Sequence, residues 1–424
     1  MRFEDAHADA LEASKYQAML DRVAAKTHVY PEGRFGGRGV VVCGGGNTYF
    51  ACAWVCIGML RRLGCALPVE LWYRGPAEMN AEMLDIMRSA GVVCVDAYEV
   101  ARRHPVHRLD SWELKPFAIV NSGFEEVLYL DADNVPVRDP APIFDSQGYA
   151  EMGAVFWPDR YTGGPGSGLE WMKRSAWEVC RVPYRLEPEM EAGQLFIDKR
   201  RCWHPLALAL HMNEHSDFYY AHFYGDKDTF RLAWHRAGRA FARVPHPVGN
   251  LGSSDVIVQH DFEGRVLFQH RNGDKWSVTR EPRRVPGFLG EDSCRALLSE
   301  LKARWRPPVR RLPSEFTEAE RAAYEEVCAT RSFEYQLEGI GARLLELRPD
   351  FNVGHGGALM EVAWMVEEDK DGEAVLSIHN AHAPTCFLRR APSGAWEGRW
   401  RVYDRMRVRL APATNSVTGS SGTT

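Results

Sequence analysis

Short apolar runs alternate with longer amphipathic segments from residue 39 to residue 133. The apolar runs cover residues 39–43, 68–73, 92–97 and 126–133, and the helical segments between them cover residues 49–64, 77–90 and 112–121. The short runs have the length and content of buried strands, whereas the longer segments repeat their apolar positions at helical spacing. This alternation predicts an α/β, Rossmann-like fold with a mostly parallel sheet flanked by helices. Ligands of such sheets bind at the carboxyl ends of the strands.

The pattern continues with less regular spacing up to residue 270. Further strands are predicted at residues 153–159, 193–199, 241–246, 255–260 and 266–270, and further helices at residues 169–180, 205–214 and 228–237. Before the first strand, residues 1–30 have the pattern of an amphipathic helix. Residues 31–39 form a loop that is rich in proline and glycine.

The last third of the chain changes character. Residues 280–330 are charged and helical, and the proline-rich residues 306–313 give the strongest linker signal. Repeated short strand-like runs follow, and the chain ends in Ser, Thr and Gly. The chain therefore divides into an N-terminal helix and loop (1–36), an α/β domain (37–280), a helical linker (281–330), a small β-rich domain (331–411) and a disordered tail (412–424).

Four aromatic residues stand out in the β-rich domain: Trp364, Trp396, Trp400 and Tyr403. They could stack on sugar rings as a glycan-binding module. We favour the other interpretation, that they pack in the core, because small β domains draw much of their stability from a few large aromatic side chains.

Composition narrows the possible partners. The chain is 45% hydrophobic and 26% charged, as in globular proteins, and its formal net charge of −5 gives no general attraction to nucleic acid.

The most apolar run, residues 49–60, is shorter than the roughly 20 residues of a membrane span, so no transmembrane anchor is expected. Residues 1–17 lack the order of a signal peptide, and the ten scattered cysteines suggest reduced core thiols. We therefore expect a cytoplasmic protein.

The strongest candidate for chemistry is the end of the strand at residues 126–133. This apolar run ends in Asp131 and Asp133, and a polar turn closed by proline follows. At a strand end both carboxylates can turn toward one point, where oxygen ligands suit Mg²⁺ or Mn²⁺ bound to phosphate oxygens. Such a cation would neutralise a leaving nucleoside diphosphate. The alternative is a pair of turn-forming aspartates.

Residues 268–276 offer further ligands and cations near the end of the α/β region. His270 follows an apolar run and could give a neutral imidazole to Mn²⁺. Lys275 or Arg271 could pair with diphosphate oxygens. A surface histidine and a solvated lysine are the plain alternatives.

Two other polar stretches flank predicted elements. Glu191 and Gln194 lie at the start of the strand at residues 193–199, and Asp226, Lys227 and Asp228 lie at a helix start. Asp228 could simply cap that helix. Taken alone, both stretches are more typical of solvated surface than of a site.

The loop after the first strand carries Gly44, Gly45, Gly46 and Asn47. The glycines let the backbone approach a ligand closely, and the Asn47 amide supplies both a donor and an acceptor. Because this loop lacks Lys and Arg, it fits contact with a nucleoside better than the triphosphate cradle of a nucleotidyltransferase. An NAD-dependent oxidoreductase is disfavoured, because no GxGxxG motif with a following acidic residue is present.

Four segments in this order carry a family resemblance: residues 112–144, 191–199, 224–230 and 270–276. Together they resemble the mannosyltransferase family that includes the fungal Golgi α-1,2- and α-1,3-mannosyltransferases, over roughly residues 37–280. The resemblance implies the GT-A fold, a nucleotide-sugar donor and retention of anomeric configuration. The β-rich C-terminal region lies outside it.

The resemblance also implies roles for individual residues. Asp131 and Asp133 would form the Asp-x-Asp metal site, completed by His270, and Lys275 would contact the diphosphate. Glu191 and Gln194 would lie near the donor sugar, and Asp226 and Lys227 would line the sugar or acceptor site. Lys115, in the first segment, joins Asp131 in the expected donor-binding set.

The expected function is therefore transfer of a hexose with retention, using Mn²⁺ or Mg²⁺. GDP-mannose is the favoured donor, and the acceptor would be a glycan, lipid or protein hydroxyl. Retention allows either a double displacement, with Glu191 as the nearest nucleophile candidate, or a front-face substitution, which we favour. The alternatives are a transferase that uses a UDP-sugar and a non-catalytic carbohydrate-binding protein.

Overall fold

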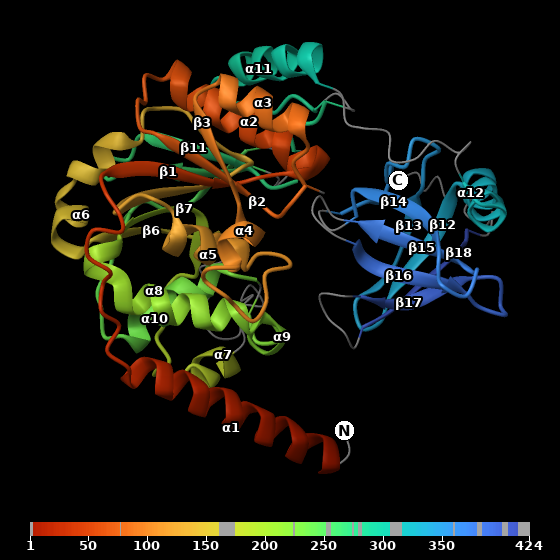
Figure 1. The fold of residues 1–424 in the computed structure, drawn as a ribbon, viewed down its shortest axis with the longest axis horizontal. Coiled ribbons are helices and arrows are strands. Elements are labelled where there is room, and N and C mark those ends of the chain that lie inside the picture. The colour runs from red at the N-terminus through yellow and green to blue at the C-terminus, as the bar shows by residue number, and fades with distance from the viewer. Residues whose placement is uncertain are drawn as a thin grey trace, which may run out of the picture. The chain divides into compact units, whose positions relative to one another are not determined.

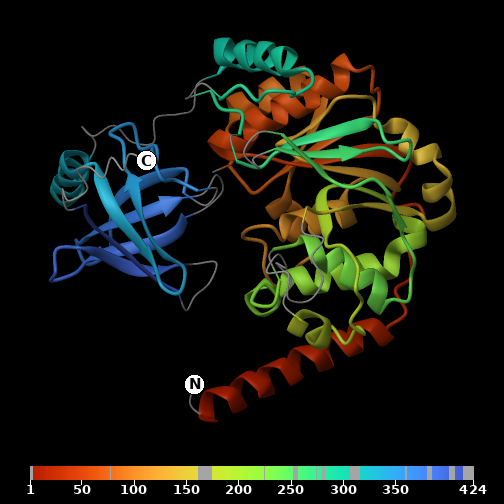
Figure 2. The same ribbon diagram turned by 180° about the vertical axis from the view of Figure 1, so that it is seen from behind.

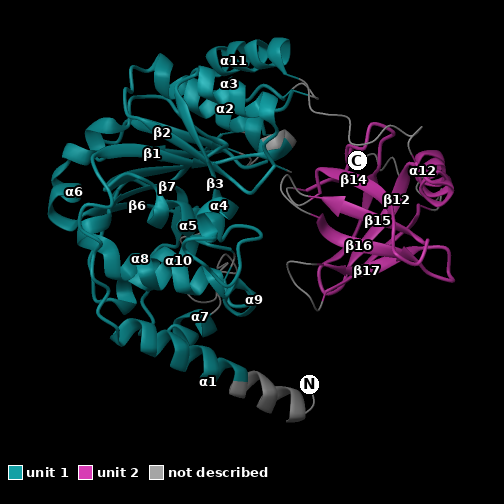
Figure 3. Ribbon diagram, in the orientation of Figure 1, with its two compact units in different colours: residues 1–307 teal, residues 308–424 magenta. Residues whose placement is uncertain are grey.

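The computed structural model describes residues 3–76, 78–160, 174–223, 225–251, 256–273, 275–278, 282–305, 316–358, 361–379, 384–400 and 406–413, without the side chains of residues 3–11, 47 and 48. The chain forms two compact units, residues 1–307 and residues 308–424 (Figure 3). In the described part of the chain, no helix combines the length and the apolar character that crossing a membrane requires.

The first unit is built on a seven-stranded sheet with the order β3-β2-β1-β4-β7-β6-β8 (Figure 1). Its strands are β1 (Arg38–Cys43), β2 (Val69–Tyr73), β3 (Val92–Asp96), β4 (Glu126–Asp131), β6 (Ala154–Pro158), β7 (Met190–Asp198) and β8 (Ala242–Arg243). The neighbours β3, β2, β1 and β4 are parallel, whereas β7 runs antiparallel to β4 and β6. The predicted mostly parallel sheet is confirmed, with β7 as its reversed strand.

The reversal of β7 decides what lies at the carboxyl end of β4. In the antiparallel register Glu126 lies opposite Asp198, and Leu130 lies opposite Gln194. The first half of β7 therefore runs beside the end of β4. Glu191 and Gln194 reach the same edge of the sheet as Asp131 for this reason.

Helices cover both faces of this sheet. On one face, α2 (Gly46–Arg62), α3 (Ala81–Ser89) and α11 (Glu291–Arg304) contribute to one hydrophobic core. On the other face, α1 (Phe3–Ala25), α5 (Leu114–Asn121), α7 (Arg174–Val179), α8 (Lys199–Glu214) and α10 (Lys227–Arg236) contribute to a second core. Short elements complete the unit: α4 (Ala97–Ala101), α6 (Gln147–Met152), α9 (Ser216–Tyr219) and a 3₁₀ turn, η1 (Ala141–Asp145). The predicted α/β architecture, a sheet flanked by helices, is confirmed.

A second, antiparallel sheet of four strands extends the carboxyl edge of the first. It has the order β5-β11-β10-β9, with β5 (Asn134–Pro136), β9 (Gly249–Leu251), β10 (Val256–His260) and β11 (Val266–Arg271). From behind, its longer strands are seen in green in front of the larger sheet (Figure 2). Since β5 starts directly after Asp133 and Asn134 pairs with His270, this register brings His270 to the Asp-x-Asp turn.

The helix α11 belongs to the core of the first unit. Trp54 on α2 donates its indole N–H to the Leu297 carbonyl at 2.8 Å. A Cβ on Gly58 would lie 2.5 Å from a Leu297 methyl, so α2 and α11 touch closely at that glycine. The cysteines Cys52, Cys56 and Cys294 are free and buried in the same layer, as expected for reduced core thiols.

The second unit is a single seven-stranded antiparallel sheet with the order β13-β12-β18-β17-β16-β15-β14. Its elements are α12 (Glu318–Thr330), β12 (Ser332–Leu337), β13 (Gly341–Glu346), β14 (Ala363–Glu368), β15 (Ala374–His379), β16 (Pro384–Arg390), β17 (Trp396–Trp400) and β18 (Arg407–Pro412). A Thr317–Glu320 capping box starts α12. Trp364, Trp396 and Trp400 are buried, which confirms the core interpretation, and Tyr403 lies outside the described residues.

Candidate active site

The carboxylate of Asp131 lies at the end of β4 among groups from three elements. Tyr129, two positions earlier on the same face of β4, donates its hydroxyl to Asp131 Oδ1 at 2.7 Å. Lys115 of α5 places its Nζ 3.2 Å from Asp131 Oδ1 and 2.9 Å from Asp226 Oδ2, and donates to the Ala192 carbonyl at 2.9 Å. Lys115 thus ties the end of β4 to β7 and to the segment before α10.

Charge pairing at Lys115 is strong because the group is buried. Burial opposes its charge, but Asp131 and Asp226 together raise the pKa of Lys115 well above its ordinary value. For Asp226 the balance is reversed: burial, with Asp131 nearby, raises its pKa to about 6 although Lys115 opposes the shift. The structure therefore brings together Asp131, Lys115 and Asp226, three of the residues that the sequence singled out.

Asp133 is buried and held by two cations. His270 Nε2 donates to Asp133 Oδ1 at 3.1 Å, and Lys275 Nζ pairs with Oδ2. Burial raises the pKa of Asp133, but Lys275 and His270 outweigh it and hold the pKa far below its usual range. Lys275 Nζ also lies 5.0 Å from the centre of the Tyr49 ring, so this lysine reaches the first turns of α2.

Asp131, Glu191 and His270 form a set that fits a metal ion. One ligand atom from each lies within 4.8 Å of the others. Two carboxylates and an imidazole are ligands that Mn²⁺ accepts. Asp133 lies beside this set, bonded to the other ring nitrogen of His270. Glu191 was expected near the donor sugar, and in the structure it belongs to this candidate metal set.

The space between these ligands depends on Gly193. A Cβ at this position would lie 2.6 Å from His270 Nδ1 and 2.9 Å from Glu191 Oε1, so no other residue fits without displacing both. His270 Nδ1 is buried without a hydrogen-bond partner in the described part of the chain, and lies 3.5 Å from Glu191 Oε1. Burial opposes a charged imidazole, but Asp133 and Glu191 raise the pKa of His270 to about 10. The carboxylates of Asp133 and Glu191 thus favour a positive charge at this position, and a bound divalent cation would also provide one.

Gln194, three residues after Glu191 on β7, has an unpaired amide N–H among the described residues. Its Oε1 accepts from Asn134 Nδ2 at 2.7 Å, and the same Asn134 amide donates to the Gly193 carbonyl at 2.8 Å. Among the described residues, Gln194 Nε2 has no hydrogen-bond partner although the side chain is fully buried. A polar group on a bound molecule would satisfy such a donor, since an unpaired buried amide is unfavourable.

Lys227 lies in a neighbouring cluster of acidic side chains. Its Nζ is 2.5 Å from Asp159 Oδ2 and 2.7 Å from Glu189 Oε2. These pairs tie the start of α10 to the residue after β6 and the residue before β7. Asp228 does not cap α10 as the sequence suggested: the helix starts at Lys227, and the buried Asp228 pairs with Arg231 at 2.7 Å. Position alone could not show this, because the choice depends on Arg231 one turn later.

The glycine loop starts beside the same sheet edge, since Cys43 of β1 pairs with Asp131. The Gly46 N–H donates to the Glu78 carbonyl at 2.7 Å, and Gly46 has a positive φ of 61°, which glycine adopts easily. A Cβ on Gly45 would lie 2.9 Å from Glu78 Cβ, so this backbone packs tightly. The side chain of Asn47 lies outside the described residues.

Sequence reasoning missed three groups of this site: Tyr129, Asn134 and Asp159. Tyr129 could have been found, because residues two apart on a strand share a face and Asp131 was already the candidate. Asn134 and Asp159 carry no such local signal. Their partners Gln194 and Lys227 are distant in sequence, so only the fold shows the contacts.

The chain is similar in sequence to fungal mannosyltransferases. It is 27% identical to the α-1,2-mannosyltransferase MNN2 of Saccharomyces cerevisiae over 60% of this chain and 51% of that protein. It is 26% identical to the α-1,2-mannosyltransferase MNN21 of Candida albicans over 55% of this chain and 43% of that protein. The chain thus spans about half the length of these curated relatives.

Among solved structures, the galactosyltransferase LgtC with donor and acceptor sugar analogues matches 63% of this chain and 100% of that chain, with 15% identity and a TM-score of 0.39. The bifunctional glycosyltransferase WbbM matches 50% of this chain and 40% of that chain, with 11% identity and a TM-score of 0.37. The family described as "Mannosyltransferase putative" matches residues 37–164 and 182–271, just over half of the chain. The chain belongs to this mannosyltransferase family.

Proposed function

We propose that this chain is a glycosyltransferase that transfers a mannosyl residue, with retention, from a nucleotide-sugar donor to a hydroxyl acceptor. The observation that carries the proposal is the set of Asp131, Glu191 and His270, whose ligand atoms lie within 4.8 Å of one another at the carboxyl end of β4. Ligands bind at this edge of open α/β sheets. Mannose is proposed as the transferred sugar because the relatives described above are α-1,2-mannosyltransferases.

In this proposal Asp131, Glu191 and His270 hold Mn²⁺ or Mg²⁺, and Asp133 holds His270 in place through Nε2. The cation, when bound, neutralises the developing charge of the leaving nucleoside diphosphate. Lys275, from the segment that follows β11, is placed to exchange its pairing with Asp133 for a diphosphate oxygen. Lys115 and Asp226 keep Asp131 in position.

The geometry favours front-face substitution over double displacement. A nucleophile must be free to attack the anomeric carbon, but Glu191 accepts the Gly193 N–H at 2.8 Å and faces His270. In the front-face route the acceptor oxygen bonds to the anomeric carbon on the side that the diphosphate leaves. The bond from that carbon to the diphosphate oxygen breaks, and a diphosphate oxygen takes the acceptor proton. Gln194, whose Nε2 has no hydrogen-bond partner among the described residues, would donate to an oxygen of the bound sugar.

GDP-mannose is the favoured donor, and a UDP-sugar is the second candidate. The base would meet the loop at Gly44–Gly46 and Asn47, beside the end of β1. A pocket that hydrogen-bonds guanine rejects uracil, because the wrong base leaves buried polar groups unpaired. The acceptor class is open among glycan, lipid and protein hydroxyls.

Donor hydrolysis and transfer with a panel of nucleotide sugars test this function. We expect the full chain to release GDP from GDP-mannose in the presence of Mn²⁺, with loss of most activity in Asp131→Asn and none in Asp85→Asn, an exposed carboxylate of α3. A preference for UDP-sugars would still support a glycosyltransferase but would contradict transfer of mannose from GDP-mannose. Sugar binding without turnover for any acceptor would instead indicate a non-catalytic carbohydrate-binding protein.

A further inference from the structure

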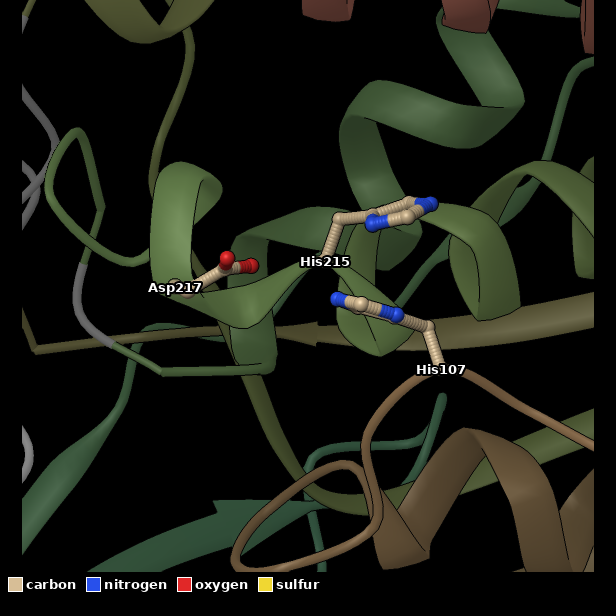
Figure 4. A group of neighbouring side chains, drawn as sticks. All are labelled: His107, His215 and Asp217. Carbon is tan, nitrogen blue, oxygen red and sulfur yellow. The ribbon is translucent and has the colours of Figure 1, made fainter.

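Three histidines and two carboxylates gather on the first unit, away from the strand-end set. The members are His107, His211, Glu214, His215 and Asp217. His107 lies in the loop between α4 and α5, and the others lie at the end of α8 and the start of α9. Figure 4 shows the imidazole rings of His107 and His215 facing each other, with Asp217 on the neighbouring turn.

The spacing of these side chains is that of metal ligands. The ligand atoms of His107, His215 and Asp217 lie within 4.8 Å of one another, and so do those of His211, Glu214 and His215. The ring centres of His107 and His211 lie 4.9 Å and 4.7 Å from that of His215. His215 is therefore common to both sets, with exposed partners on one side and the buried His211 on the other.

His211 provides an independent sign of a missing partner. It is buried, and its Nε2 has no hydrogen-bond partner within the described part of the chain. Its Nδ1 lies 3.4 Å from Glu214 Oε1, an arrangement that orients metal-binding imidazoles in many proteins.

We propose that this histidine cluster is a second metal site, for a divalent ion of the Zn²⁺ class, centred on His215. His107 and Asp217 bind from the exposed side, and His211 completes the site from the buried side with Glu214 behind it. Imidazole nitrogen suits Zn²⁺, whereas the carboxylate-rich set at Asp131 suits Mn²⁺ or Mg²⁺. The two sites thus differ in ion as well as in place.

The ion would join two segments that lead into the active site. Eight residues after His107 comes Lys115, and nine residues after Asp217 comes Asp226, its ion-pair partner at 2.9 Å. The segments already touch: the backbone N–H of His107 donates to Glu214 Oε2 at 3.3 Å, and the Ser216 hydroxyl donates to Glu113 Oε1. We therefore expect a structural role, with the ion raising the thermal stability of the first unit.

Calorimetric titration of Zn²⁺ into the metal-stripped, tag-free full chain tests the site, with Co²⁺ absorption as a probe of ligand geometry. We expect one saturable site, an increase in Tm on binding, and affinity at least about tenfold weaker in His107→Ala, His215→Ala and Asp217→Asn. Two controls should bind Zn²⁺ as the parent does. Asp131→Asn disables the other metal set, and His204→Ala removes a histidine from the unrelated pair with His28, whose ring centres are 5.2 Å apart.

Three results would overturn the proposal: no saturable Zn²⁺ binding, unchanged binding in all three cluster variants, or loss of binding in Asp131→Asn. His107 and Asp217 are exposed, so their variants should fold even if His215→Ala does not. In that case, titration of Zn²⁺ into His107→Ala and Asp217→Asn is sufficient to test the proposal. None of these Zn²⁺-binding measurements requires donor hydrolysis.

Discussion

Glu191 is held from two directions at the first half of β7. Its Oε1 accepts the Gly193 N–H at 2.8 Å and lies 3.5 Å from His270 Nδ1. Burial raises the pKa of Glu191, but His270, Lys227 and Lys115 outweigh it and lower the pKa to about 2. The side chain is thus a fixed anion, which suits a metal ligand better than an attacking group.

The substitution Glu191→Gln separates these two roles. If Glu191 binds the ion, Mn²⁺ affinity should fall about tenfold or more together with turnover, because a ligand charge is lost. If Glu191 were instead the nucleophile, Glu191→Gln would lose turnover but keep its Mn²⁺ affinity. Calorimetric titration of Mn²⁺ measures the difference. The control is Glu178→Gln, an exposed glutamate in α7, which should leave both properties at the level of the parent.

Lys199, the first residue of α8, makes the stability of the fold depend on pH. It is fully buried and donates to the Ser122 carbonyl at 2.8 Å. Burial outweighs the opposing effect of Glu70 and lowers the pKa of Lys199 to about 6. An unfolded lysine has a pKa of about 10.4. Between these values the unfolded chain binds more protons than the folded chain, so the free energy of unfolding rises with pH.

In Lys199→Met this contribution should disappear. From pH 6.5 to 8.5, the parent should gain up to about 1.4 kcal/mol per pH unit relative to the variant. Urea unfolding at three pH values measures the two slopes. Lys26→Met, at an exposed position, should keep the slope of the parent. Equal slopes in the parent and in Lys199→Met would mean that Lys199 stays charged in the folded chain.

At the level of elements, β7 contributes Glu191 to the metal set, and Gly193 on the same strand packs against both Glu191 and His270. The substitution Gly193→Ala would place a methyl group 2.6 Å from His270 Nδ1. His270 or Glu191 must then move, so Mn²⁺ binding and donor hydrolysis should fall to near background while circular dichroism stays unchanged. In the control Gly36→Ala the new Cβ meets nothing within 4 Å. Full Mn²⁺ affinity in Gly193→Ala would place the ion elsewhere.

The strands themselves were predictable because buried strands leave short apolar runs. The runs at residues 39–43 and 126–133 became β1 and β4, and the aspartates at the end of β4 lie where strand-end carboxylates should lie. The direction of β7 was not predictable. Its apolar run has the same alternation whichever way the strand runs, and only the antiparallel pairing with β4 brings Gln194 opposite Leu130.

Contacts between distant segments set the rest of the site. The partners of Lys115 come from β4, from β7 and from the residue before α10, and no local pattern relates these segments. Asp226 and Lys227 looked like solvated helix-start residues in the sequence. Asp226 is buried and Lys227 is half-buried, and both form ion pairs because the fold places Lys115 beside Asp226 and Asp159 beside Lys227.

At the level of the whole molecule, the proposed donor and metal groups all lie in the first unit, residues 1–307. That unit needs α11, which follows the last of these groups. Cys294, Leu298 and Leu301 of α11 are buried in the core that also contains α2. The helix α2 in turn carries Tyr49, beside Lys275, and Cys52, which donates to the Trp276 carbonyl at 3.5 Å. Loss of α11 would therefore disturb the segment that carries Lys275.

Two truncated chains test this division. A chain that ends at residue 307 should bind Mn²⁺ and GDP-mannose as tightly as the full chain, because every proposed ligand and its packing remain. A chain that ends at residue 280 should unfold at a lower temperature and bind both more weakly, since removing several large buried side chains costs several kcal/mol. Thermal unfolding and calorimetric titration measure these properties. If the chain of 307 residues were folded but did not bind the donor, the second unit would have to supply part of the donor site. If the chain of 280 residues were equally stable, α11 would not be part of the core that supports the active site.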